Sequence, residues 1–159
     1  MRSHSALSAH RMGIAAAIAL AAAALSAPPA LAQDGPGMRA GLSADPDQFF
    51  VGMHYVTQPL TGMLRFQPNA EAGFGNDLTT VTFNGEAALW MKVSPEWHVY
   101  VGGGPAMNLY RYSGRNKTDV DPGLNAIVGL RRRGGLFFEL KVGAFDSPSV
   151  KLLVGYTIR

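Results

Sequence analysis

Residues 150–159 read VKLLVGYTIR, a run in which apolar side chains occupy every second position. One face takes Val150, Leu152, Val154, Tyr156 and Ile158, and the other takes Lys151, Leu153, Gly155, Thr157 and Arg159. A period of two places successive side chains on opposite faces of a β-strand, whereas an amphipathic helix needs apolar residues three and four positions apart. The segment therefore predicts a strand with two unlike faces.

The same alternation recurs through most of the preceding chain. Residues 136–145 read LFFELKVGAF, and an unbroken apolar face there opposes Glu139 and Lys141. Short segments rich in Gly, Pro and Asp separate the alternating runs, as turns between strands do. Only the polar stretch Ser113–Gly123 is long enough to predict an extended loop. The eight expected strands are Met38–Ser43, Gln48–Thr57, Met63–Gly73, Thr79–Val93, Trp97–Tyr112, Leu124–Arg132, Leu136–Phe145 and Val150 to the C-terminus.

The connections predict how these strands are arranged. Strands joined by short turns pair as antiparallel neighbours, so we expect an all-β fold, an eight-stranded antiparallel up-and-down β-barrel without helices. Gly102–Gly104 lies inside an expected strand and predicts a bend or bulge of the kind that barrels use to close. Pro68 and Pro105 count against uninterrupted strands because proline cannot donate to a ladder, and we expect them to mark bulges or strand ends.

The first 32 residues have the pattern of a secretory signal peptide. Basic Arg2 and Arg11 precede an uncharged apolar run, Gly13–Leu25, and the small-residue site Ala30–Ala32 follows. That run has 13 residues, whereas a membrane-spanning helix needs about 20. We therefore expect cleavage before Gln33, leaving one domain of residues 33–159.

Charge and cysteine content narrow the class of protein. Residues 33–159 carry 12 Lys and Arg against 11 Asp and Glu, and this near-balance argues against nucleic acid as a partner. The sequence contains no cysteine, so we expect neither a disulfide nor a cysteine-linked lipid anchor.

Two arrangements fit strands with unlike faces. The apolar faces are almost free of charge over about nine to eleven residues, the length that a tilted strand needs to cross a bilayer. This favours apolar faces turned towards lipid, around a polar lumen. The alternative is a soluble periplasmic barrel that binds a small apolar ligand in the lipocalin manner, with the apolar faces inward. For the first arrangement we predict a structural network of paired charges in the lumen, made of Arg65, Glu71, Glu86, Arg131, Glu139, Lys141 and Lys151.

Several stretches carry a family resemblance. They are Arg39–Leu42 with Asp45–Gln48, Pro68–Gly75, Trp97–Pro105 and the final alternating strand. The mature chain resembles the small outer-membrane β-barrel proteins of Gram-negative bacteria, the group that contains OmpX and the OmpA transmembrane domain. The resemblance implies a location in the cell outer membrane, contact with outer-membrane lipid and the barrel-insertion machinery as a partner during biogenesis. We expect a monomer with a structural or envelope-interaction role and without an open pore.

Outward aromatic residues near strand ends are candidates for interfacial girdles: Phe49, Tyr55, Phe74, Trp97 and Tyr156.

Catalytic chemistry has little support in the sequence. Some barrels of this size are enzymes that act on lipid A and use a lipid-facing His with a Ser close by. Residues 33–159 hold only His54 and His98, and neither has a Ser within reach along its strand. Two isolated histidines also make a poor metal site. We therefore expect no catalytic residue, metal or cofactor, and a lipid A-modifying enzyme is the third hypothesis.

Overall fold

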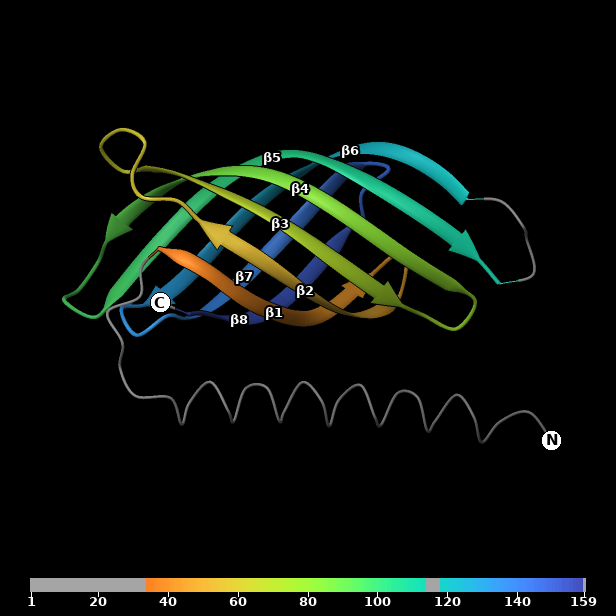
Figure 1. Cartoon of the computed structure of the whole chain (residues 1–159), viewed down its shortest axis with the longest axis horizontal. Coiled ribbons are helices and arrows are strands. Elements are labelled where there is room, and N and C mark those ends of the chain that lie inside the picture. Colours follow the sequence, from red (N-terminus) through yellow and green to blue (C-terminus); the bar gives the residue numbers. More distant parts are fainter. Residues whose placement is uncertain (1–33, 114–117, 159) are drawn as a thin grey trace.

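The computed structural model describes residues 34–113 and 118–158, which form a β-barrel (Figure 1). The predicted signal peptide, residues 1–32, lies outside the described residues. None of the described residues belongs to a helix long and apolar enough to span a membrane. The eight strands are β1 (Gly35–Ala44), β2 (Gln48–Val56), β3 (Leu64–Phe74), β4 (Leu78–Lys92), β5 (Trp97–Tyr112), β6 (Thr118–Arg132), β7 (Leu136–Phe145) and β8 (Val150–Thr157).

The strands follow sequence order around the barrel, and β8 pairs with β1 to close it. Every neighbouring pair is antiparallel, as the short connections predict. The strands are also staggered. Paired partners traced from Trp90 around the barrel return to β4 at Thr80, ten residues away, and this offset tilts the strands relative to the barrel axis. The path runs through Tyr100, Gly129, Glu139, Leu153, Gly41, Phe50 and Gly73.

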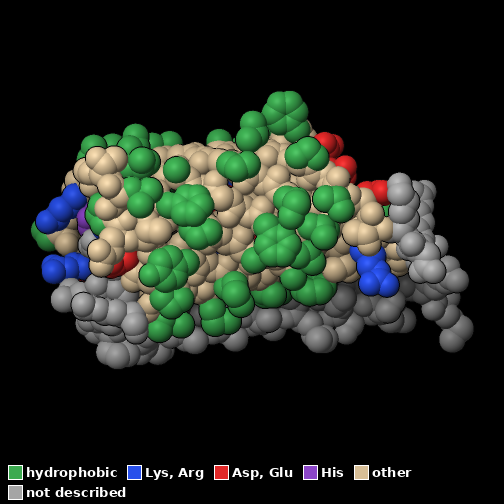
Figure 2. Space-filling view, turned by 45° about the horizontal axis from the view of Figure 1, so that its top comes forward, with side chains coloured by type: hydrophobic (Ala, Val, Ile, Leu, Met, Phe, Trp, Pro, Cys, Tyr) green, Lys and Arg blue, Asp and Glu red, His purple; other side chains and the backbone are tan. Residues whose placement is uncertain are grey.

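The apolar faces point outward. On β8, Val150 and Leu152 are exposed while Lys151 and Leu153 are buried, and the pattern repeats along the other long strands. Figure 2 shows hydrophobic side chains spread over the middle of the barrel and charged side chains gathered near its two ends. Exposed large hydrophobic residues occur on all eight strands, among them Met38, Met53, Phe66, Phe83, Val101, Val128, Phe138 and Leu152. This is the reverse of a lipocalin-like barrel, whose apolar side chains line the interior.

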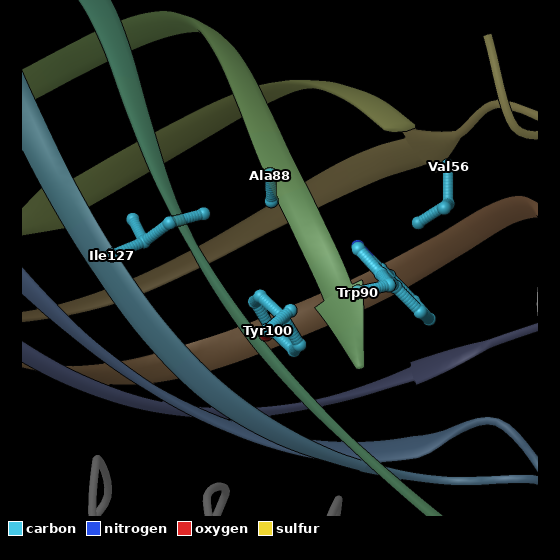
Figure 3. Packing of buried hydrophobic residues seen from close by; sticks show 5 residues of the cluster. All are labelled: Val56, Ala88, Trp90, Tyr100 and Ile127. Atoms are coloured by element: carbon cyan, nitrogen blue, oxygen red, sulfur yellow. The ribbon is translucent and has the colours of Figure 1, made fainter. Parts of the chain in front are cut away.

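The interior is packed with aromatic and polar side chains. One buried apolar cluster contains Val56, Ala88, Trp90, Tyr100 and Ile127, whose side chains lie inside the barrel wall (Figure 3). A second cluster contains Phe50, Phe137 and Leu153. An eight-stranded barrel is just wide enough for side chains to fill its interior, and both clusters lie among charged residues.

The prolines lie within strands. Pro68 pairs with Gly85 inside β3, and Pro105 pairs with Leu124 inside β5, so neither marks a strand end. Asn84 of β4 pairs with Ala106 of β5, and the next pair is Ala87 with Gly103. The two residues between these pairs on each strand, 85–86 and 104–105, are therefore not paired with each other. Close backbone approach explains the adjacent glycines: a Cβ at Gly104 would lie 1.9 Å from the carbonyl oxygen of Gly85.

The long-loop prediction is wrong for part of Ser113–Gly123. Residues Thr118–Gly123 belong to β6 and pair with Ala106–Arg111 of β5, and residues 114–117 lie outside the described residues. Asp119, Asp121 and Pro122 gave this segment the composition of a loop. Pairing with the long strand β5 overrides that preference, because those β5 residues pair with β4 on one side and would otherwise lack ladder partners on the other.

The two ends of the barrel differ in charge. The terminal end, where β1 begins and β8 ends, includes the turns at 93–96 and 133–135 and carries Lys92, Arg132 and Arg133. At the opposite end lie six of the seven aspartates: Asp45, Asp47, Asp77, Asp119, Asp121 and Asp146. The proposed girdle residues divide between the ends, with Tyr55, Trp97 and Tyr156 near the terminal end and Phe49 and Phe74 near the aspartate end.

Candidate functional site

Glu71 is the centre of a charged layer inside the barrel. Its Oε1 lies 3.4 Å from Arg39 Nη1 and 3.2 Å from Lys141 Nζ, and its Oε2 lies 2.7 Å from Lys151 Nζ. The side chains of all four residues are at least 95% buried. One carboxylate on β3 is thereby bonded to cations on β1, β7 and β8, which come from opposite parts of the sequence.

Two further carboxylates extend this charged layer. Glu86 Oε1 on β4 lies 2.7 Å from Lys141 Nζ, and Glu139 Oε1 on β7 lies 3.3 Å from Arg39 Nη1. The other oxygen of Glu139 accepts a hydrogen bond from the Tyr100 hydroxyl at 2.7 Å. Buried charges are stable only when they are paired and hydrogen-bonded, and each of the three glutamates meets both conditions.

A chain of side-chain amides joins the charged layer at Glu86. Asn125 Nδ2 donates to Asn84 Oδ1 at 2.7 Å, and Asn84 Nδ2 donates to Asn69 Oδ1 at 2.7 Å. Asn69 Nδ2 then donates to Glu86 Oε2 at 2.8 Å. The amides of three strands, β3, β4 and β6, therefore form a relay of hydrogen bonds that ends on a carboxylate of the charged layer.

Arg131 and Arg65 lie nearer the terminal end, against aromatic rings. The Arg131 Cζ atom is 5.0 Å from the Trp90 ring centroid and 4.7 Å from that of Phe137, and the Arg65 Cζ atom is 4.9 Å from the Trp90 centroid. These are cation–π distances. Trp90 also stacks on Tyr100, with centroids 5.2 Å apart.

The two histidines have different surroundings. His54 is buried in the lumen, where its Nε2 lies 2.9 Å from Thr157 Oγ1 and its ring meets the edge of Phe137. His98 is half-buried near the terminal end, with its ring centroid 6.3 Å from that of Trp90. Neither has the lipid-facing position beside a Ser that the enzyme hypothesis requires.

The structure brings five of the seven predicted lumen residues into the charged layer: Glu71, Glu86, Glu139, Lys141 and Lys151. The other two, Arg65 and Arg131, form no ion pair with these glutamates among the described residues. Sequence reasoning missed Arg39, which bridges Glu71 and Glu139, and Tyr100. The alternation of β1 contained the signal for Arg39, since Met38 and Leu42 are exposed on the opposite face.

No family model matches the chain, and no curated protein matches it in sequence. A comparison with solved structures gives matches that include the following two. The N-terminal β-barrel domain of Pseudomonas aeruginosa OprF has a TM-score of 0.53 at 14% identity, over 79% of this chain and 98% of that one. The de novo designed protein TMB2.3 has a TM-score of 0.45 at 20% identity, over 80% of this chain and 99% of that one. The likeness to OprF shows that the chain has the fold of an outer-membrane-type eight-stranded barrel.

Proposed function

We propose that this protein is a small barrel of the cell outer membrane with a structural or envelope-interaction role. The observation that carries the proposal is the apolar outer surface, which runs around all eight strands. Exposed apolar patches on soluble monomers rarely exceed a few hundred Å², whereas a membrane barrel needs a continuous apolar band flanked by aromatic residues. Tyr55 and Phe74, at opposite ends, are both about half exposed.

The barrel has no open pore in this proposal. Ion pairs with N···O distances of 2.7–3.4 Å join β1, β3, β4, β7 and β8 across the lumen. These side chains fill the space through which ions would have to pass. Conductance across planar bilayers tests this point. We expect the reconstituted protein to give no steady current at low voltage, and discrete channel openings there would contradict a closed lumen.

The proposed role is not catalytic and needs no cofactor. His54 and Thr157 are both buried in the lumen, away from the outer surface where a lipid substrate would lie. Mass spectrometry of lipid A from cells that overproduce the protein tests this. Lipid A of unchanged mass is expected, and a new acylation or deacylation product would contradict the proposal.

The proposed partners are outer-membrane lipid and, during biogenesis, the barrel-insertion machinery; the protein acts as a monomer and binds no nucleic acid. Cell fractionation is the direct test of location. We expect the protein in the outer-membrane fraction, as a band whose gel mobility changes when the sample is heated in detergent. Release of the folded protein with the soluble periplasm would overturn the proposal.

A further inference from the structure

The buried charges of the lumen do not balance. Among the described residues, four cations have less than 5% of their surface exposed, and three carboxylates are equally buried. Glu71, Glu86 and Glu139 are bonded to Arg39, Lys141 and Lys151, so the excess positive charge falls on Arg131. An uncompensated buried charge is strongly unfavourable, and Arg131 is only 2% exposed.

The guanidinium group of Arg131 also has unused donors. Its Nε and Nη2 atoms are buried without a hydrogen-bond partner. These two nitrogens form one edge of the planar group, and their N–H bonds are parallel, the geometry that binds two oxygens of a carboxylate or phosphate together. Buried donors are almost always satisfied in native structures, so this edge requires an acceptor.

The surroundings of Arg131 supply further donors and positive charge. The indole Nε1 of Trp90 is buried without a partner, and Trp90 contacts both Arg131 and Arg65. Arg39 lies against the same Phe137 ring as Arg131, with its own Nε and Nη2 edge open. The nearest carboxylate on this side, Glu139, is already bonded to Arg39 and Tyr100.

Arg131 lies close to the terminal end of the barrel, next to the last residue of β6. Arg131 is the neighbour of Arg132, which reaches solvent, and Arg131 pairs across the ladder with His98. Arg65 and His98 are only half-buried there. An anion that enters between them therefore meets the guanidinium group of Arg65 before it reaches Arg131.

We propose that Arg131 binds a small oxyanion of the phosphate class inside the terminal end of the lumen. The two N–H groups of its open edge hold two oxygens of the anion, and the negative charge neutralises the excess charge of the lumen. Because Arg131 is so deeply buried, the ligand is a free anion and not the headgroup of a membrane lipid.

The test measures how inorganic phosphate stabilises the folded chain in detergent micelles. Urea unfolding is followed at increasing phosphate, with sodium chloride keeping the ionic strength constant, because a ligand that binds only the folded state raises the unfolding midpoint. We expect the midpoint to rise with phosphate in the wild type and to stay constant in Arg131→Met. Arg132→Met is the matched control: it removes a neighbouring charge that points outward, so its midpoint should rise as in the wild type.

Phosphorus-31 line broadening reports binding independently of stability. We expect the inorganic phosphate signal to broaden with the wild type and with Arg132→Met, but not with Arg131→Met. Arg131→Lys keeps the charge and loses the paired donors, so binding should weaken about tenfold, the equivalent of one charged hydrogen bond.

Three results would overturn the proposal. One is a wild type that neither broadens the phosphate signal nor gains stability from phosphate. Another is an equal response in Arg131→Met and the wild type. The third is stabilisation by short-chain phosphatidylglycerol but not by inorganic phosphate, which would assign the basic end to lipid headgroups instead.

Discussion

Replacing Glu71 with glutamine should destabilise the barrel more than any other single change of charge. Glu71→Gln keeps the size of the side chain but leaves Arg39, Lys141 and Lys151 without the carboxylate that all three contact at 2.7–3.4 Å. Removing one partner of a buried ion pair costs about 3–5 kcal/mol because the other charge stays buried. Lys151 has no other carboxylate partner among the described residues, so we expect a loss of at least this size.

Urea unfolding in detergent micelles measures this loss. The heat-dependent gel shift reports the fraction of protein that is still folded at each urea concentration. The matched control is Glu96→Gln, which breaks the 3.4 Å pair with Arg132 at the surface, where both side chains are more than half exposed. Such exposed pairs contribute about 0–1 kcal/mol. The double variant Glu71→Gln with Lys151→Met should regain part of the loss. If Glu71→Gln is as mild as Glu96→Gln, the charged layer does not stabilise the fold as we argue.

Three further substitutions, the first with a control variant, test other parts of the structure by urea unfolding, in lipid bilayers for the first pair and in detergent micelles for the others. Leu140→Arg puts a charge on the outer face of β7 and should lower the free energy of unfolding by about 2–4 kcal/mol in a bilayer. The control, Val93→Arg in the β4–β5 turn, should lower it by about 0–1 kcal/mol. Equal losses in the two variants would count against a lipid-facing surface. Asn84→Leu interrupts the amide relay and should cost about 1–3 kcal/mol, because Asn125 loses its acceptor and Asn69 its donor; a neutral result would mean that the relay is dispensable. Gly129→Ala places a Cβ 2.1 Å from Tyr100 Cζ and should cost about 1–3 kcal/mol by overpacking, and an unchanged midpoint would show that the Tyr100 ring can move aside.

The strand faces could be predicted from the sequence because alternation depends on each residue and its nearest neighbours. On β7, Phe137, Glu139 and Lys141 are buried while Phe138 and Leu140 are on the outer surface, as the period of two predicts. Which face meets the lumen was open to two interpretations, and the structure resolves it because charged side chains of β3, β7 and β8 converge inside.

The ion pairs could not be predicted in the same way, because a strand pattern gives the face of a residue and not its level along the barrel. Arg65 is on β3 with Glu71 but six residues away, or about 20 Å along the strand, and it therefore lies by Trp90 near the terminal end. Glu71 and Lys141 are 70 positions apart in sequence, and only the stagger of the closed barrel brings them together.

The start of β6 was missed for a related reason. Asp119, Asp121 and Pro122 favour a turn when they are considered alone. Their place in a strand depends on the ladder with β5, in which Pro122 pairs with Met107 and Asp121 with Asn108. Local composition does not reveal a partner strand of that length.

The central claim, that the apolar outer faces meet lipid, is tested most directly with single-cysteine variants, which the absence of native cysteine makes simple. A fluorophore is attached at Leu140→Cys or Leu152→Cys on the outer surface, and at Ser94→Cys in the β4–β5 turn as the control. In bilayers with brominated acyl chains, we predict strong quenching at positions 140 and 152 and weak quenching at position 94, with the reverse order for aqueous iodide. Labels at 140 and 152 that iodide quenches and brominated lipid does not would contradict the account.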